Sequence, residues 1–149
     1  MDRREAILER LTDVAGTVQG IVGAYRNRDE VSDDDRPAII ILDADEEASD
    51  AAFERGRPSR QRNLVTMNPE IYIILGARPA QVGTEINTLR ARLVKAVLLD
   101  GDLIALAGTN GEIRYEGCAT ALARGRQMEG EMGVSISFTY PLDPQKLTE

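Results

Sequence analysis

Four carboxylates stand close together directly after a strongly apolar run. Asp43, Asp45, Glu46 and Glu47 follow residues 38–42, a run of alanine, isoleucines and leucine that is predicted to be a strand. Carboxylates at the end of a strand can bind Mg²⁺, which prefers oxygen ligands, and such a metal can support phosphoryl chemistry. No phosphate-binding glycine loop with its lysine accompanies them in the sequence. Because clustered like charges are usually solvated, an exposed acidic loop is the main alternative.

A set of arginines forms the second candidate. Four of them are interleaved with Gly56 and Pro58, and two more, Arg26 and Arg28, lie at the start of the charged stretch 26–36. Guanidinium groups bind phosphates and carboxylates in a bidentate manner, so these arginines could contact DNA or the acidic stretch 43–50 of a neighbouring subunit. A solvated loop is again the alternative. We take as candidate assembly-interface residues Arg26, Arg28, Asp43, Asp45, Glu46, Glu47, Arg55, Arg57, Arg60 and Arg62.

The composition excludes several kinds of catalytic site. The chain has no histidine and one cysteine, Cys118. Histidine is the usual general base near neutral pH and the commonest transition-metal ligand, so a Ser-His-Asp triad or a classical zinc site cannot form within one chain. A single cysteine forms no intrachain disulfide, which is typical of synthesis in a reducing compartment. Cys118 lies in an apolar stretch, and we expect it to be a small buried side chain.

The length and charge indicate one acidic globular domain. The chain has 149 residues, 42% of them hydrophobic, and a formal net charge of −7. That length is common for a single domain, which we expect to span residues 1–149. A negative net charge argues against DNA binding as the main function, because DNA-binding proteins neutralise phosphates with lysine and arginine. No apolar run approaches the roughly 20 residues that span a membrane.

The apolar pattern predicts two helices and several strands. Asp2 and Glu5 have the spacing of a capping box, and the apolar spacing that follows predicts a helix over 3–17. Pro79 begins a second helix that ends near Gly101, with one more helical turn over 103–107. Strands are predicted at 21–25, at 38–42 with both faces buried, at 113–123 with a bulge at Gly117, and at 134–140, where apolar and polar residues alternate.

The segment between the second strand and the second helix is less regular. Residues 43–62 have few large apolar side chains and are predicted to form a long connection. A strand over 64–75 follows, interrupted at Asn68-Pro69 because proline cannot donate a ladder hydrogen bond. The order α-β-β-β-α-β-β favours the α+β class, with a mixed, mostly antiparallel sheet and two helices packed on one face.

Four segments carry a resemblance to a known family: residues 25–30 (YRNRDE), 36–40 (RPAII), 69–72 (PEIY) and 115–120 (YEGCAT). Together with the size and order of elements, they make the chain from Glu5 to Tyr140 resemble the tail terminator and minor tail proteins of long-tailed bacteriophages and gene transfer agents. The resemblance implies a ring, typically of six subunits, which caps the head-proximal end of the tail tube and stops its polymerisation. It also implies no catalytic residue and no cofactor.

The same resemblance implies the partners and the location. The ring would contact the tail tube protein and the head–tail connector, and DNA would pass through its lumen without sequence-specific binding. The protein would be made in the cytoplasm of the bacterial host and reside in the virion tail. Three alternatives stay open: another head–tail connector or a tail tube subunit, a Mg²⁺-dependent hydrolase that uses Asp43, Asp45 and Glu47, and a small ligand-binding or regulatory domain.

Overall fold

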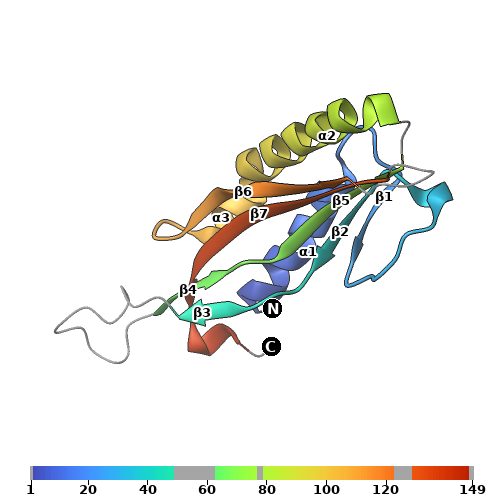
Figure 1. Cartoon of the computed structure of the whole chain (residues 1–149). Coiled ribbons are helices and arrows are strands. Elements are labelled where there is room, and N and C mark those ends of the chain that lie inside the picture. Colours follow the sequence, from blue (N-terminus) through green and yellow to red (C-terminus); the bar gives the residue numbers. More distant parts are fainter. Residues whose placement is uncertain (1, 49–62, 77–78, 123–128, 148–149) are drawn as a thin grey trace.

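The computed structural model describes residues 2–48, 63–76, 79–122 and 129–147. These residues form an α+β protein with three α-helices and a seven-stranded, mostly antiparallel sheet (Figure 1). The elements are α1 (Arg3–Gly16), β1 (Gly23–Arg26), β2 (Ala38–Leu42), β3 (Glu46–Ala48), β4 (Asn63–Met67), β5 (Glu70–Gly76), α2 (Pro79–Leu99), α3 (Gly101–Ala107), β6 (Glu112–Leu122) and β7 (Glu129–Leu142). The predicted fold class is confirmed. The additional turn predicted at 103–107 is the separate helix α3.

Strand β7 lies at the centre of the sheet. One of its edges pairs with β6, and its other edge pairs with β5 and β4 in succession. Met67 pairs with Phe138 and Glu70 with Ser135, so the register along β7 continues unchanged past Asn68-Pro69. Strands β4 and β5 are therefore one long strand that is interrupted where the sequence predicted it. Beyond β5 lie β2 and then β1, which is parallel to β2.

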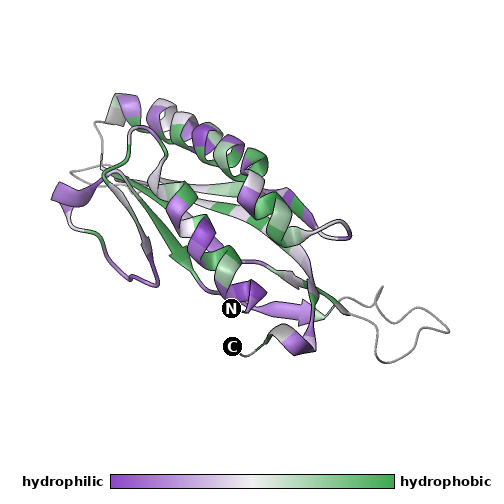
Figure 2. Ribbon diagram, turned by 180° about the vertical axis from the view of Figure 1, so that it is seen from behind, coloured by the Kyte–Doolittle hydropathy of each residue, from purple (hydrophilic) through white to green (hydrophobic). Residues whose placement is uncertain are grey.

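The prediction of an unstructured connection from residue 43 was wrong for residues 46–48. Glu46, Glu47 and Ala48 form β3, which pairs with β4, and the Asn68 amide donates to the Asp45 carbonyl at 3.2 Å. β3 is an edge strand with all three side chains exposed, and Figure 2 colours it as hydrophilic. A charged edge strand has no buried face, so hydrophobic periodicity cannot reveal it. Residues 49–62 lie outside the described residues.

The helices pack together on one face of the sheet (Figures 1 and 2). Ile39, Ile73 and Phe138 contribute to this core and are fully buried. The opposite face, called the open face below, is covered at β1 and β2 by Val31 of the 27–37 segment, which packs with Ala38 and Ile40. This arrangement explains the continuous apolar run of β2, which is buried on both faces as predicted. No helix among the described residues is long and apolar enough to cross a membrane.

The capping box predicted at the start of α1 is partly formed, and the bulge predicted in β6 is present. The Asp2 carboxylate caps α1 by accepting from the Arg4 amide at 3.3 Å. The Glu5 carboxylate instead accepts hydrogen bonds from Arg26. The predicted bulge in β6 is present, with a register shift between Tyr115 and Gly117, and Gly117 has a φ of +138° that only glycine adopts readily.

Candidate assembly interface

Arg26 is the centre of an ionic cluster within the subunit. Its Nε and Nη2 donate to the two carboxylate oxygens of Asp43, both at 2.8 Å. Its Nη1 and Nη2 donate to the Glu5 carboxylate at 2.5 and 3.0 Å. Arg4 adds a hydrogen bond of 2.6 Å to the Ala44 carbonyl. The cluster joins the start of α1, the end of β1 and the bend after β2, so two of the candidate interface residues bind each other inside one subunit.

This cluster makes part of the stability depend on pH. The hydrogen bonds from Arg26 lower the pKa of Asp43 and the pKa of Glu5 below their ordinary values. A carboxyl with a lowered folded pKa stabilises the fold fully above its unfolded pKa, about 4, and loses that contribution as the pH falls through the folded value. The cluster should therefore stabilise the protein at neutral pH and stop doing so in acid.

Replacing Arg26 with methionine is expected to lower the free energy of unfolding by about 1 kcal/mol at pH 7, since partial exposure to water screens the ion pairs. The difference from the wild type should shrink as the pH falls below about 4. Urea unfolding at several pH values measures both effects. Lys95→Met is the control, because Lys95 is exposed on α2 and has no ion pair among the described residues. An Arg26→Met deficit that stays constant down to pH 2 would contradict this account.

The remaining acidic candidates have separate surroundings. Glu46 accepts a hydrogen bond from the hydroxyl of Tyr140, whose ring is fully buried. Burial and this carboxylate raise the pKa of Tyr140. Asp45 and Glu47 are exposed. Among the described cysteine, aspartate and glutamate residues, no group of three or more is placed to hold a metal ion. The described geometry therefore gives no support to a Mg²⁺ site formed by Asp43, Asp45 and Glu47.

The basic candidates divide into two groups. The exposed Arg28 guanidinium lies 3.9 Å from the centre of the ring of Tyr25, a half-buried residue of β1, as a cation–π contact. Arg55, Arg57, Arg60 and Arg62 lie outside the described residues. The predicted contact between the acidic and basic stretches of neighbouring subunits therefore stays a prediction.

Strand β6 is a long edge strand that sequence analysis did not single out. It pairs with β7 along ten residue pairs, and no other described strand pairs with its outer edge. The side chains from Arg114 to Glu116 and from Cys118 to Thr120 are exposed. Residues 117–122 carry no charge. A long, uncharged edge with free backbone groups is a template for pairing with another chain, and natural proteins usually protect such edges.

The prediction that Cys118 is buried was wrong. Cys118 is an exposed free cysteine on β6. β6 is the outermost strand on its side of the sheet, and the helices pack mainly over the inner strands, so a short side chain there stays open to water. An apolar sequence identifies a strand without revealing whether its neighbours cover it. The small residues at 117–121 were the available signal for an edge.

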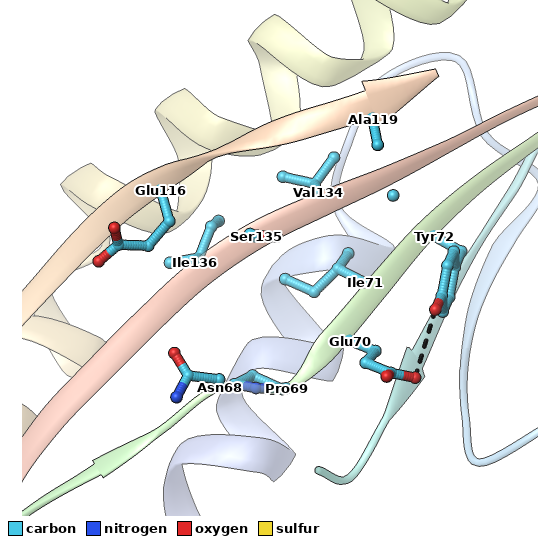
Figure 3. A pocket seen from close by; sticks show the side chains of 11 residues that line it. Asn68, Pro69, Glu70, Ile71, Tyr72, Glu116, Ala119, Val134, Ser135 and Ile136 are labelled. Carbon is cyan, nitrogen blue, oxygen red and sulfur yellow. Dashed lines mark hydrogen bonds between the residues drawn. The ribbon is translucent and has the colours of Figure 1, made fainter. Parts of the chain in front are cut away.

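The open face carries a hollow of about 360 Å³ where β5, β7 and β6 lie side by side. Two rows of paired residues cross it: Tyr72 with Gly133 and Ala119, and Glu70 with Ser135 and Gly117. The residues of β7 and β6 in these rows are small, whereas those of β5 are large, and this difference leaves the space. In Figure 3, Glu116 of β6 lies across β7 from Glu70 and Tyr72 of β5. The Tyr72 hydroxyl donates to Glu70 at 3.3 Å, and the Ser137 hydroxyl donates to Glu116 at 2.9 Å.

Comparisons with known proteins give no family. No protein-family model matches the chain, and no curated protein is significantly similar to it.

Proposed function

We propose that this protein is a structural tail terminator of a long-tailed bacteriophage or a gene transfer agent. In this role it forms a closed ring, typically of six subunits, at the head-proximal end of the tail tube. The ring stops tube polymerisation and provides the surface that joins the head connector. The observation that carries the proposal is the exposed β6 edge, whose residues 117–122 offer an uncharged stretch of strand to a neighbouring subunit. The sequence resemblance indicates the kind of assembly, a phage tail, in which this edge would be used.

A ring requires an interface in which two different surfaces of identical subunits meet and whose rotation closes. Strand addition at a sheet edge is one such contact, since the backbone hydrogen bonds provide affinity and the side chains provide specificity. Among the described strands, β6 forms the outer edge on one side of β7, and β1 and β3 are the outer strands on the other side, so each subunit has different edges. The net charge of −7 repels DNA and suits a passage that DNA crosses without binding.

Deletion of the gene is expected to give tails of excessive or irregular length that do not join heads. A terminator is the component that ends tube growth. Without it, the tube protein still polymerises, but the length of the tube is no longer limited. Electron microscopy of the particles measures tail length and head attachment. Tails of normal length without heads would instead identify a connector, and the absence of tails would identify a tube subunit. Intact particles would contradict a structural role.

A further inference from the structure

The hollow on the open face has the chemistry of a guanidinium site. Two carboxylates, Glu70 and Glu116, stand on opposite sides of a floor made of small residues. The ring of Tyr72 lies next to Glu70 and close to the Gly133 backbone. A guanidinium is planar, donates in a bidentate manner to carboxylates and stacks on aromatic rings. The hollow thus offers an arginine side chain opposite charge and an aromatic ring.

We propose that this hollow binds the arginine-rich segment 55–62 of a second copy of the chain. That segment reads RGRPSRQR and contains four arginines and no acidic residue. The same open face carries the further carboxylates Glu112 and Glu131. Its basic residue across β6 and β7 is Arg114, whose Nε lies 3.1 Å from the Glu112 carboxylate and 3.8 Å from that of Glu116, so acidic side chains still outnumber basic ones there. The most basic stretch of an acidic protein and an acidic hollow are therefore complementary. The inference rests on the proposed function only in that identical subunits assemble.

The segment and the hollow belong to two different parts of the subunit. The chain leaves the sheet after Ala48 and returns at Asn63, at the end of the β3–β4 pair. From Asn63 to Glu70 the strand runs for about 23 Å at 3.3 Å per residue, and the hollow lies in that direction. The segment is thus attached to one end of the sheet, while the hollow lies further along it. A contact between these two different surfaces is of the heterologous type that builds rings.

A labelled peptide of residues 53–63 tests the site directly. The receptor is the full chain with Arg55, Arg57, Arg60 and Arg62 changed to glutamine, so that its own arginines do not compete. We expect saturable binding by fluorescence anisotropy, and at least about tenfold weaker binding when Glu70→Gln and Glu116→Gln are added, because both charges of the site are lost. Absent binding, or equal binding by both receptors, would overturn the proposal.

A matched control separates the hollow from overall charge. Glu9→Gln with Asp13→Asn removes the same two charges from the exposed surface of α1. This receptor should bind the peptide as tightly as the unmodified one. Equal losses in the two double variants would mean that the peptide senses net charge only, and the proposal would fail. Thermal unfolding of each receptor checks that the fold is intact.

Exchanging the charges tests whether the segment binds the hollow of a second copy or the hollow of its own copy. In one full-length variant, Glu70 and Glu116 become lysine; in another, the four arginines become glutamate. Each variant alone should lose self-association by light scattering, whereas their mixture should recover it through the exchanged pairs. If the mixture stays dissociated, or if each variant associates like the wild type, the contact between copies is contradicted. Binding of the peptide is measured without tails, so it tests the hollow independently of the gene deletion. The peptide can fail to bind even if the deletion supports a terminator, and it can bind even if the deletion contradicts one.

Discussion

Changing Gly111 to alanine should destabilise the protein by more than about 3 kcal/mol, since the new methyl group overlaps main-chain atoms that cannot easily move. A Cβ at this position would lie 2.0 Å from the Ala107 carbonyl oxygen and 2.3 Å from that of Thr139. For a domain of this size, the melting temperature should fall by at least about 6 °C. Thermal and urea unfolding measure the loss.

The reason for this close approach is the turn between α3 and β6. Gly108 ends α3 with a φ of +81°, and the Gly111 amide donates to the Gly108 carbonyl at 3.1 Å. Directly afterwards, Glu112 pairs with Thr139 of β7. The chain must therefore pass between the end of the helix and the central strand, where only hydrogen fits at the Cα of residue 111.

Gly83 provides the matched control. It lies within α2, is exposed, and has no atom within 4 Å of the position that a Cβ would take. Gly83→Ala should raise the free energy of unfolding by about 0.5–1 kcal/mol, because alanine is the better helix former. If Gly111→Ala unfolds at the same urea concentration as the wild type, the turn does not have the geometry described.

A lysine at Thr120 is expected to abolish the ability of the protein to restore normal tails in the deletion strain. Thr120 is exposed and lies in the uncharged part of β6. A lysine on an edge strand opposes pairing with another strand, because its charge would lose water in the new interface. Electron microscopy of the complemented particles gives the fraction of tails of normal length.

Thr109→Lys makes the identical change in the turn that precedes β6, where the side chain is also exposed. It should restore normal tails as the wild-type gene does. Both variants should melt within a few degrees of the wild type, since surface substitutions of this kind rarely change stability by more than about 0.5 kcal/mol. Normal tails with a folded Thr120→Lys protein would exclude the β6 edge as the subunit contact.

The fold was predictable where burial imposes a pattern. β7 alternates because one face packs under the helices, and β2 is continuously apolar because the 27–37 segment covers its second face. The interruption at Asn68-Pro69 and the bulge at Gly117 follow from the conformational limits of proline and the freedom of glycine. These effects are local, or repeat along one strand, and can therefore be recognised in one sequence.

The candidate site was less predictable because it depends on contacts between distant residues. Arg26 was named for contacts between subunits, yet it binds Glu5 and Asp43 in its own chain. Nothing in the spacing of these three residues indicates that α1 and the bend after β2 meet. The hollow is equally hidden, since it forms where small residues of β7 and β6 lie next to Glu70 and Tyr72 of β5.

The central position of β7 has a consequence for the order of folding. β7 follows the other described strands in sequence, yet it is the strand through which β6 joins β5 and β4. β1, β2 and β5 can pair with one another before β7 is made, as can β3 and β4, but β6 has no partner among the other described strands until β7 follows it. The pairing of β7 with β4 and β5 is non-local and slow compared with helix formation. β6 therefore acquires one paired edge and one free edge only when β7 is in place. A partly synthesised subunit does not yet present the surface that we propose for assembly, so subunits can join only after each has completed its sheet.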